Sequence, residues 1–253
     1  MTVVDTRLDS RGVYTITLDD PAKRNALSQG LTTELVAAMD RVDTDPAVRV
    51  AVITNTGSVF CAGADLSERS TSSGDSAAVD PLALFRRIQD SPKPWVGRIA
   101  GHAVAGGTGL AAALDISVAH VDAKFGFTEV RLGVAPAIIS VICLPKMRLG
   151  DARSAFLRGQ RFDGAEAARL GLITKAVEPE QLDDEVDAIV DDLLLGGPNA
   201  LAAAKDVLQR IPQMHPDDAF VWAAARSAQL FASDEAAEGM AAYLEKRPPT
   251  WTA

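Results

Sequence analysis

The sequence predicts an α/β protein, and three features of its residue pattern carry this prediction. Segments with strand character alternate with segments of helical period through residues 12–119, as expected when crossover connections join the strands of a sheet. From Asp163 onward the pattern is almost wholly helical and rich in alanine. The 253 residues, 47% of them hydrophobic, supply enough apolar side chains for one large core with an appendage.

The predicted strands are short and end at turn residues. Residues 12–18 alternate apolar and polar side chains, which is typical of a half-buried strand, and Asp20-Pro21 follows them. Residues 48–54, 95–100 and 115–119 are further strand candidates because they are short and largely apolar. We expect these segments to form the sheet of the core.

Capping residues mark where the predicted helices begin. Ser28 is a candidate N-cap, and the segment after it has an apolar face at helical spacing. The residues of this face are Leu31, Leu35, Met39 and Val42. A second helix, made of small residues, is predicted from about residue 107 to residue 114.

The later helix boundaries are marked in the same way. Asp163 and Glu166 resemble a capping box, and Gly171 is a predicted helix end. Pro198 and Pro216 are predicted first residues of later helices.

Composition excludes several classes of protein. The net charge is −9, whereas a general nucleic-acid surface needs clustered cations. No apolar stretch reaches the ~20 residues of a membrane span, and the N-terminal segment has no signal-peptide pattern. Cys61 and Cys143 form no disulfide framework and are predicted to be reduced, buried thiols. We therefore expect a cytoplasmic protein without nucleic-acid or membrane partners.

Common catalytic and metal-binding motifs are absent from the sequence. There is no P-loop, no GxGxxG, no HExxH, no EF-hand loop and no GxSxG. The three histidines, His102, His120 and His215, are widely spaced, which argues against a histidine-rich metal site. We expect no metal centre.

Two segments of small residues are the candidates for chemistry. Residues 60–66 read FCAGADL, and residues 101–110 read GHAVAGGTGL. Small side chains let the backbone approach a ligand closely. A turn that enters a helix also leaves N–H groups without an intrahelical acceptor, and such groups bind anions.

These two segments, together with others in the same order, resemble the crotonase (enoyl-CoA hydratase/isomerase) family. The resemblance spans nearly the whole chain, and an ordered series of motifs is far more specific than any one of them. The other matching segments are residues 25–27, 124–133, 162–167, 170–172, 238–240 and 245–247.

The resemblance implies a fold and an assembly. The expected fold is a spiral of ββα repeats that forms two near-perpendicular sheets, followed by a C-terminal helical region that builds trimers. Trimers of this family commonly pair into hexamers. We accordingly divide the chain into a core with the active site, residues 1–195, and a C-terminal helical region, residues 196–253.

The resemblance also implies where an oxyanion would bind. The two N–H donors of the family fall on Ala64 and Gly106 of this sequence. Reactions at the α or β carbon of a thioester pass through an enolate, so negative charge grows on the thioester oxygen. Fixed N–H dipoles at that point lower the barrier, and they require only a small side chain.

The positions that bind coenzyme A in the family can be carried over in the same way. Lys23 and Arg24 are suited to phosphate groups, and Lys246 matches a residue that reaches the coenzyme. The remaining positions are Ala26, Ala62, Ala64, Asp65, Leu66 and Gly106. Coenzyme A would enter as part of an acyl-CoA substrate, so no separate cofactor is expected.

One departure from the family pattern concerns the catalytic carboxylates. Many hydratases of the family use two glutamates. The second falls on Glu129, whereas Gly109 stands at the position of the first. Glu68, in the Ser-rich segment 67–80, is a candidate replacement, and this segment is either a surface loop or a lid beside the site.

Three interpretations follow from the single matched glutamate. The favoured one is an enoyl-CoA hydratase in which Glu129 and an ordered water share the proton transfers. Residues 128–140 support it, because they resemble hydratases of branched or glutaconyl-type thioesters, which often lack the first glutamate. The alternatives are a Δ3–Δ2 enoyl-CoA isomerase with one base and a non-catalytic acyl-CoA-binding scaffold. Hydrolysis and decarboxylation are further reactions of the family.

Residues 135–140 stand where hydratases of the family more often have a glycine-rich turn. The bulky Ile138 and Ile139 in this segment are expected to alter the acyl pocket.

Overall fold

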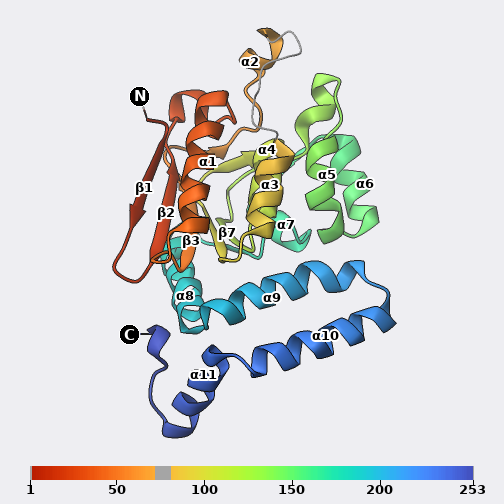
Figure 1. Ribbon diagram of the computed structural model, residues 1–253. Coiled ribbons are helices and arrows are strands. Elements are labelled where there is room, and N and C mark those ends of the chain that lie inside the picture. The colour runs from red at the N-terminus through yellow and green to blue at the C-terminus, as the bar shows by residue number, and fades with distance from the viewer. Residues whose placement is uncertain (1, 72–80, 253) are drawn as a thin grey trace.

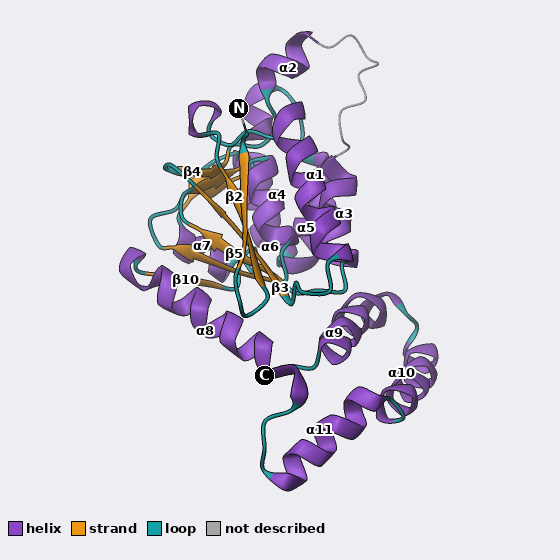
Figure 2. Ribbon diagram, turned by 60° about the vertical axis from the view of Figure 1, so that its left-hand side comes forward, coloured by secondary structure: helices purple, strands orange, loops and turns teal. Residues whose placement is uncertain are grey.

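The computed structural model describes residues 2–71 and 81–252, and in these ranges it contains two β-sheets (Figures 1 and 2). The larger sheet has the strand order β1-β2-β3-β5-β7-β10 and the smaller sheet the order β4-β6-β8-β9. The larger sheet consists of β1 (Val4–Leu8), β2 (Val13–Leu18), β3 (Val50–Asn55), β5 (Trp95–Ile99), β7 (Ile116–His120) and β10 (Lys175–Val177). The smaller sheet consists of β4 (Val59–Cys61), β6 (His102–Val104), β8 (Phe125–Gly126) and β9 (Arg161–Phe162).

The chain alternates between the two sheets in a repeated pattern. Strands β3, β5 and β7 pair in parallel in the larger sheet, and each is followed by a short strand of the smaller sheet. These short strands, β4, β6 and β8, also pair in parallel as neighbours. The segments that follow β4, β6 and β8 therefore begin side by side, although they are far apart in the sequence. The predicted α/β fold is confirmed.

Helices cover both faces of the larger sheet (Figure 2). Helices α1, α3 and α4 lie on one side, and α8 lies on the other. The helices of the core are α1 (Gln29–Thr44), α2 (Leu66–Thr71), α3 (Pro81–Asp90), α4 (Gly106–Ala113), α5 (Ala137–Cys143), α6 (Leu149–Arg158), α7 (Gly164–Arg169) and α8 (Leu182–Leu195). Those that follow are α9 (Pro198–Arg210), α10 (Pro216–Phe231) and α11 (Asp234–Glu245).

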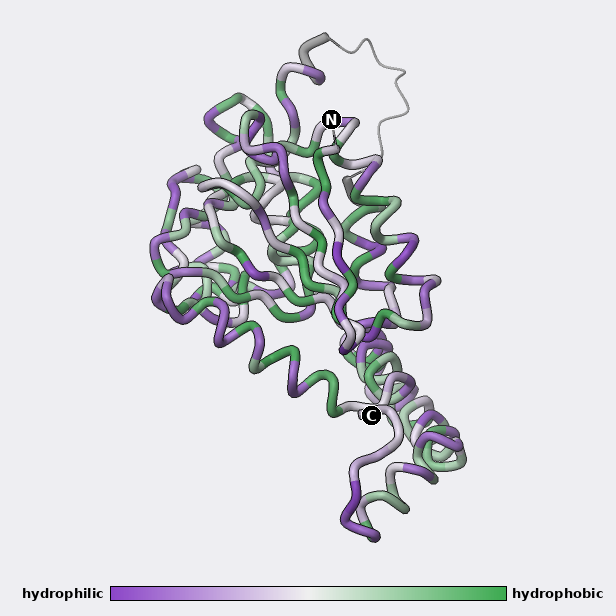
Figure 3. Tube along the Cα trace, turned by 90° about the vertical axis from the view of Figure 1, so that its left-hand side faces the viewer, coloured by the Kyte–Doolittle hydropathy of each residue, from purple (hydrophilic) through white to green (hydrophobic). Residues whose placement is uncertain are grey.

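Strand β3 shows how one sheet separates two hydrophobic clusters. All six of its residues are buried. Ala51 and Ile53 belong to the cluster that includes α1, α3 and α4, whereas Val50 and Val52 belong to the cluster with α8. Successive side chains of a strand point to opposite faces, so a strand buried on both faces is apolar throughout. Figure 3 shows hydrophilic and hydrophobic residues alternating along α8, as a helix with one buried face requires.

The structure confirms the predicted starts of three helices, one by a capping contact and two by an N-terminal proline. The hydroxyl of Ser28 accepts a hydrogen bond from the Leu31 N–H at 3.2 Å. Leu31, Leu35, Met39 and Val42 are fully buried. Helices α9 and α10 begin at the two expected prolines.

The predicted capping box of α7 is only half formed. The carboxylate of Asp163 accepts a hydrogen bond from the Glu166 N–H at 2.9 Å. The side chain of Glu166 does not return this contact but pairs with Arg169 at 2.6 Å. An ion pair one turn along the helix has replaced the reciprocal bond of the box.

Helices α9, α10 and α11 form an arm below the core in Figure 1. One buried ion pair holds the arm to the core: Lys205 of α9 lies 2.6 Å from Asp115 and also donates to the carbonyls of Ile88 and Lys93. The outer part of the arm is largely exposed, and its exposed apolar side chains are Phe220, Val221, Phe231, Met240, Tyr243 and Leu244. The division at residues 195 and 196 stays a prediction.

The Ser-rich segment differs from the predicted loop at its start. Residues 66–71 form α2, and residues 72–80 lie outside the described part of the chain. Across the residues that the structure describes, no helix combines the length and apolar character needed to cross a membrane.

Candidate active site

A cavity of about 1020 Å³ opens where the segments after β4, β6 and β8 meet. Its wall includes all the residues carried over from the resemblance except Lys246. The carried-over residues that line it are Lys23, Arg24, Ala26, Ala62, Ala64, Asp65, Leu66, Gly106 and Glu129. The spiral of strands thus brings together residues from four separate parts of the sequence.

Backbone hydrogen bonds hold the first two of these parts together. The Leu27 N–H donates to the Gly63 carbonyl at 2.7 Å, and the Ala62 N–H donates to the Arg24 carbonyl at 3.1 Å. The fully buried Asn25 holds the loop at residues 20–27 in place. Its side-chain amide donates hydrogen bonds to the carbonyls of Thr56 and Val59 and accepts one from the Asp20 N–H. Its φ of 50° is the left-handed conformation that asparagine tolerates better than most residues.

The amides of Ala64 and Gly106 lie at the same place in the cavity. A Cβ atom built on Gly106 would lie 3.7 Å from the nitrogen of Ala64. Gly106 is the first residue of α4, so its N–H has no intrahelical acceptor. Among the hydrogen bonds of the described residues, neither amide donates to another group. Two backbone N–H groups without an acceptor among the described residues therefore lie close together in the wall of the cavity.

The backbone at Ala105 is strained. This residue has φ 50° and ψ −123°, a conformation rarely adopted by residues other than glycine. It sits directly before the Gly106 amide, at the turn from β6 into α4. Strain of this kind costs about 1–3 kcal/mol and persists where the surrounding structure enforces it. Here it sets the direction in which the Gly106 N–H points.

Glu129 reaches the cavity from the segment after β8. It lies in a short 3₁₀ turn, Thr128–Leu132, which ends at Gly133. One carboxylate oxygen, Oε2, is buried without a hydrogen-bond partner among the described residues. Burial raises the pKa of Glu129 above its ordinary value, although the residue's own backbone N–H partly opposes the shift. A buried carboxylate with a free oxygen is suited to exchange protons with a ligand.

Thr108 links helix α4 to strand β8, which precedes Glu129, and sequence reasoning did not single this residue out. Its buried hydroxyl donates to the Ala103 carbonyl at 2.8 Å and accepts from the Gly126 N–H at 3.2 Å. The signal in the sequence is one polar residue inside a run of small apolar ones. Thr108 thereby connects the start of α4, where Gly106 lies, to the strand that precedes Glu129.

Comparison with known proteins supports a single family. The model of the enoyl-CoA hydratase/isomerase family matches residues 9–253. The chain belongs to the enoyl-CoA hydratase/isomerase family. A relative from Thermus thermophilus that carries an enoyl-CoA hydratase name is 36% identical over 243 residues, which cover 94% of this chain and 96% of the relative.

Other members of the family are also similar in sequence and structure. The enoyl-CoA hydratase EchA19 of Mycobacterium tuberculosis is 33% identical over 258 residues, covering 98% of this chain and 96% of that protein. The crystal structure of an enoyl-CoA hydratase from Mycobacterium smegmatis matches with a TM-score of 0.93 and 30% identity, and all of both chains is covered.

The position of the first family glutamate is closed by a neighbouring side chain. A Cβ atom on Gly109 would lie 2.3 Å from Cγ2 of Ile139 and 3.4 Å from the ring of Phe85. Any side chain at residue 109 would therefore have to displace the Ile139 side chain. Helix α5, Ala137–Cys143, supplies the side chain that fills this space.

Glu68 does not replace the missing glutamate. Its carboxylate accepts a hydrogen bond from the Gln29 N–H at 2.8 Å, at the start of α1. It also lies 3.9 Å from Lys23. Glu68 is not among the residues that line the cavity.

The two predicted phosphate-binding cations stand at the edge of the cavity. Lys23 lies 3.3 Å from the carboxylate of Asp65, and its side chain is half exposed. Hydrogen bonds from Ser67 hold the pKa of Asp65 below its ordinary value, with a smaller contribution from Lys23. Asp65 is therefore an anion that fixes the position of Lys23.

Lys246 is separated from the other carried-over residues. It follows the last residue of α11 and does not line the cavity. Figure 1 places α11 and α2, which begins directly after Asp65, at opposite ends of the molecule.

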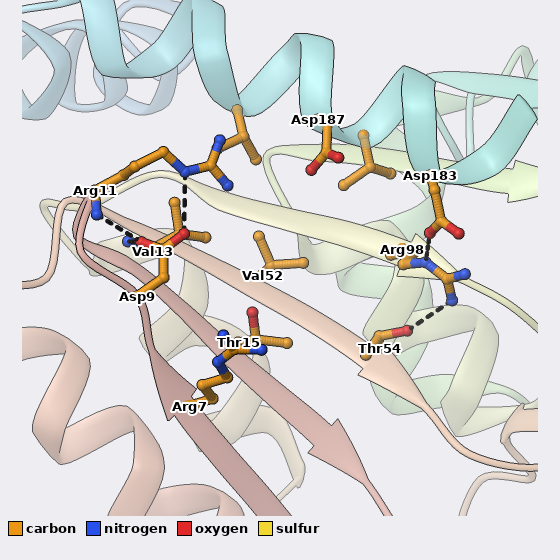
Figure 4. Close-up of a pocket in the computed structure, with 12 residues that line it drawn as sticks. Arg7, Asp9, Arg11, Val13, Thr15, Val52, Thr54, Arg98, Asp183 and Asp187 are labelled. Carbon is orange, nitrogen blue, oxygen red and sulfur yellow. Dashed lines mark hydrogen bonds and ion pairs between the residues drawn. The ribbon is translucent and has the colours of Figure 1, made fainter.

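A second hollow, of about 340 Å³, lies between the larger sheet and α8 (Figure 4). Two of the three arginines that line it are held in ion pairs. Arg11 pairs with Asp9 and Asp191, and Arg98 pairs with Asp183. These ion pairs leave little positive charge for a phosphate group, so the larger cavity is the candidate active site.

Proposed function

We propose that this chain is an enoyl-CoA hydratase that adds water across the 2,3 double bond of an enoyl-CoA thioester. One juxtaposition carries the proposal: Ala64, Gly106 and Glu129 line the same cavity. Membership of the family and the hydratase names of its relatives support the same activity.

The amides of Ala64 and Gly106 stabilise the enolate. When water adds to C3 of the acyl group, negative charge moves onto the thioester oxygen. Two N–H donors that converge on this oxygen lower the barrier, and loss of one such donor typically costs about 3 kcal/mol. The two amides have no other acceptor within the described residues, so no hydrogen bond has to break before the thioester binds.

Glu129 carries the proton transfers. Its carboxylate accepts a proton from the water whose oxygen bonds to C3, and a proton is then delivered to C2 of the enolate. The raised pKa of Glu129 lies nearer to neutral pH than that of an ordinary glutamate. A group with such a pKa can both accept a proton and return it. Because Gly109 provides no second carboxylate, an ordered water shares this work.

The coenzyme A part of the substrate lies along the loops at Lys23 and Ala62. Lys23 and Arg24 bind phosphate groups through charge-assisted hydrogen bonds. The backbone around Ala26, Ala62, Asp65 and Leu66 contacts the remainder. Coenzyme A enters with the substrate, so the reaction needs no separate cofactor.

The chain assembles as a trimer or as a dimer of trimers through its C-terminal arm. Exposed apolar side chains on α10 and α11, such as Phe220 and Tyr243 at 78% and 84% exposure, support an interface there. Lys246 could contact coenzyme A only in another copy of the chain. The mass of the protein in solution tests the assembly. A cytoplasmic location stays a prediction.

Two spectroscopic assays test the activity. Loss of the conjugated thioester absorbance after addition of a 2-enoyl-CoA supports hydration. Appearance of this absorbance from a 3-enoyl-CoA would instead identify a Δ3–Δ2 isomerase. If neither occurs but CoA thioesters bind, the result favours a non-catalytic scaffold, and assays of thioester hydrolysis and decarboxylation then test the remaining reactions of the family. A panel of straight and branched enoyl-CoA thioesters also identifies the preferred acyl group.

A further inference from the structure

The wall of the cavity beside the reacting carbons is apolar and tightly packed. Ile139 of α5 and Phe85 of α3 line it, with exposed fractions of 4% and 0%. Both lie against Gly109, where a Cβ atom would approach Cγ2 of Ile139 to 2.3 Å. Helix α5 approaches α4 so closely only because residue 109 has no side chain.

The position of this wall follows from the geometry of α4. Gly109 lies three residues after Gly106, which corresponds to about 4.5 Å along the helix axis. A thioester whose oxygen is bound by the Gly106 amide places its C2 and C3 atoms within a few bond lengths of that amide. The side chain that packs on Gly109 therefore lies beside these carbons.

Helix α5 and Glu129 border the same cavity, because Ile139 of this helix and Glu129 both line it. The acyl group is thus bordered by the carboxylate and by the Ile139 side chain.

We infer that Ile139 is a specificity-determining residue that restricts the width of the acyl group at C3, an inference that rests on the proposed hydratase function. Its side chain fills the volume that a side chain on residue 109 would occupy and limits the space for a branch on the acyl group. Farther along the cavity the wall is open, because Leu132, Val134 and Ile138 are at least 39% exposed. Chain length is therefore less restricted than branching, which differs from the branched thioesters that the resemblance of residues 128–140 implies.

The test compares two substrates in the dehydration direction. The substrates are 3-hydroxybutanoyl-CoA and 3-hydroxy-3-methylbutanoyl-CoA, which differ by one methyl group on C3. Each loses hydroxide from C3 and a proton from C2 to give water and a conjugated 2-enoyl thioester, whose absorbance is followed. The quantity of interest is the ratio of kcat/KM for the branched substrate to that for the unbranched substrate.

Ile139→Ala should raise this ratio about tenfold, since one methyl group in a tight pocket changes kcat/KM by roughly 10-fold or more. Ile142→Ala is the matched control, because Ile142 lies on the same helix, is equally buried and does not line the cavity. It should leave the ratio unchanged although both variants lower the melting temperature. Ile139→Val is a milder change and should shift the ratio in the same direction. This variant replaces Ile139→Ala in the test if the alanine variant does not fold.

The inference is overturned if the Ile139 variants change kcat/KM by the same factor for both substrates. It is also overturned if the ratio of the branched to the unbranched substrate falls. Failure of the proposed function would give a different result. In that case the unmodified protein would dehydrate neither substrate.

Discussion

Gly63 lies directly behind the amide of Gly106: a Cβ atom on Gly63 would be 2.8 Å from the Gly106 nitrogen. The φ of Gly63 is +85°, a conformation that residues with a side chain rarely adopt. This contact sets the spacing between the segment after β4 and the start of α4. The two proposed oxyanion amides, Ala64 and Gly106, therefore depend on one glycine that is not among the residues lining the cavity.

Gly63→Ala should reduce kcat by about 10²–10³-fold, which is the effect of losing one oxyanion donor. The added methyl group must push the Gly106 amide away, and the left-handed backbone costs a further 1–2 kcal/mol or so. Gly150→Ala is the control, because a Cβ atom there meets nothing within 4 Å and the residue lies in α6. Steady-state kinetics and thermal unfolding measure both effects. Normal turnover by Gly63→Ala would contradict the proposed oxyanion site.

Glu129→Gln should keep acyl-CoA binding and lose turnover by about 10²–10⁴-fold. The amide has nearly the same shape as the carboxylate but cannot accept a proton from water. Glu68→Gln provides the comparison, because Glu68 holds the start of α1 and is not among the residues lining the cavity. It should keep most of the activity. A Glu129→Gln variant as active as the unmodified enzyme would exclude Glu129 as the acid–base group.

The raised pKa of Glu129 also predicts how stability depends on pH. The folded state binds the proton more tightly than the unfolded state, whose pKa is near 4.5. The contribution of Glu129 to the free energy of unfolding therefore falls as the pH rises from 4.5 to the raised pKa. Glu129→Gln should unfold at a higher temperature than the unmodified protein at neutral pH, and the difference should shrink toward pH 4. A constant difference over this range would contradict the assigned shift.

Lys23→Ala should raise KM for enoyl-CoA by about fivefold, as expected for the loss of one exposed ionic contact. The effect should weaken at high salt because the contact is exposed. The control is the N-acetylcysteamine thioester of the same acyl group, which lacks the phosphates and should be unaffected. If KM rises equally for both thioesters, Lys23 does not act through the phosphate groups.

Features of the fold that depend on local sequence could be predicted. The apolar face that begins at Leu31, the cap at Ser28 and the prolines at 198 and 216 mark helix starts that the structure contains. Each depends on contacts within a few residues. The order of small-residue motifs identified the family because it is maintained along the whole chain.

Features that depend on tertiary contact could not be predicted. Strands β8 and β9 have two residues each, which is too short for a periodic pattern. The position of α5 depends on the contact between Gly109 and Ile139. The role of Thr108 depends on the pairing of β6 with β8, which brings Ala103 and Gly126 together.

The most direct test is a crystal structure of the protein with a saturated acyl-CoA bound. We expect the thioester oxygen to lie about 2.7–3.1 Å from the nitrogens of both Ala64 and Gly106, with the Glu129 carboxylate facing C2 and C3 of the acyl group. A thioester oxygen bound by neither amide, or an acyl group remote from Glu129, would contradict the proposed mechanism.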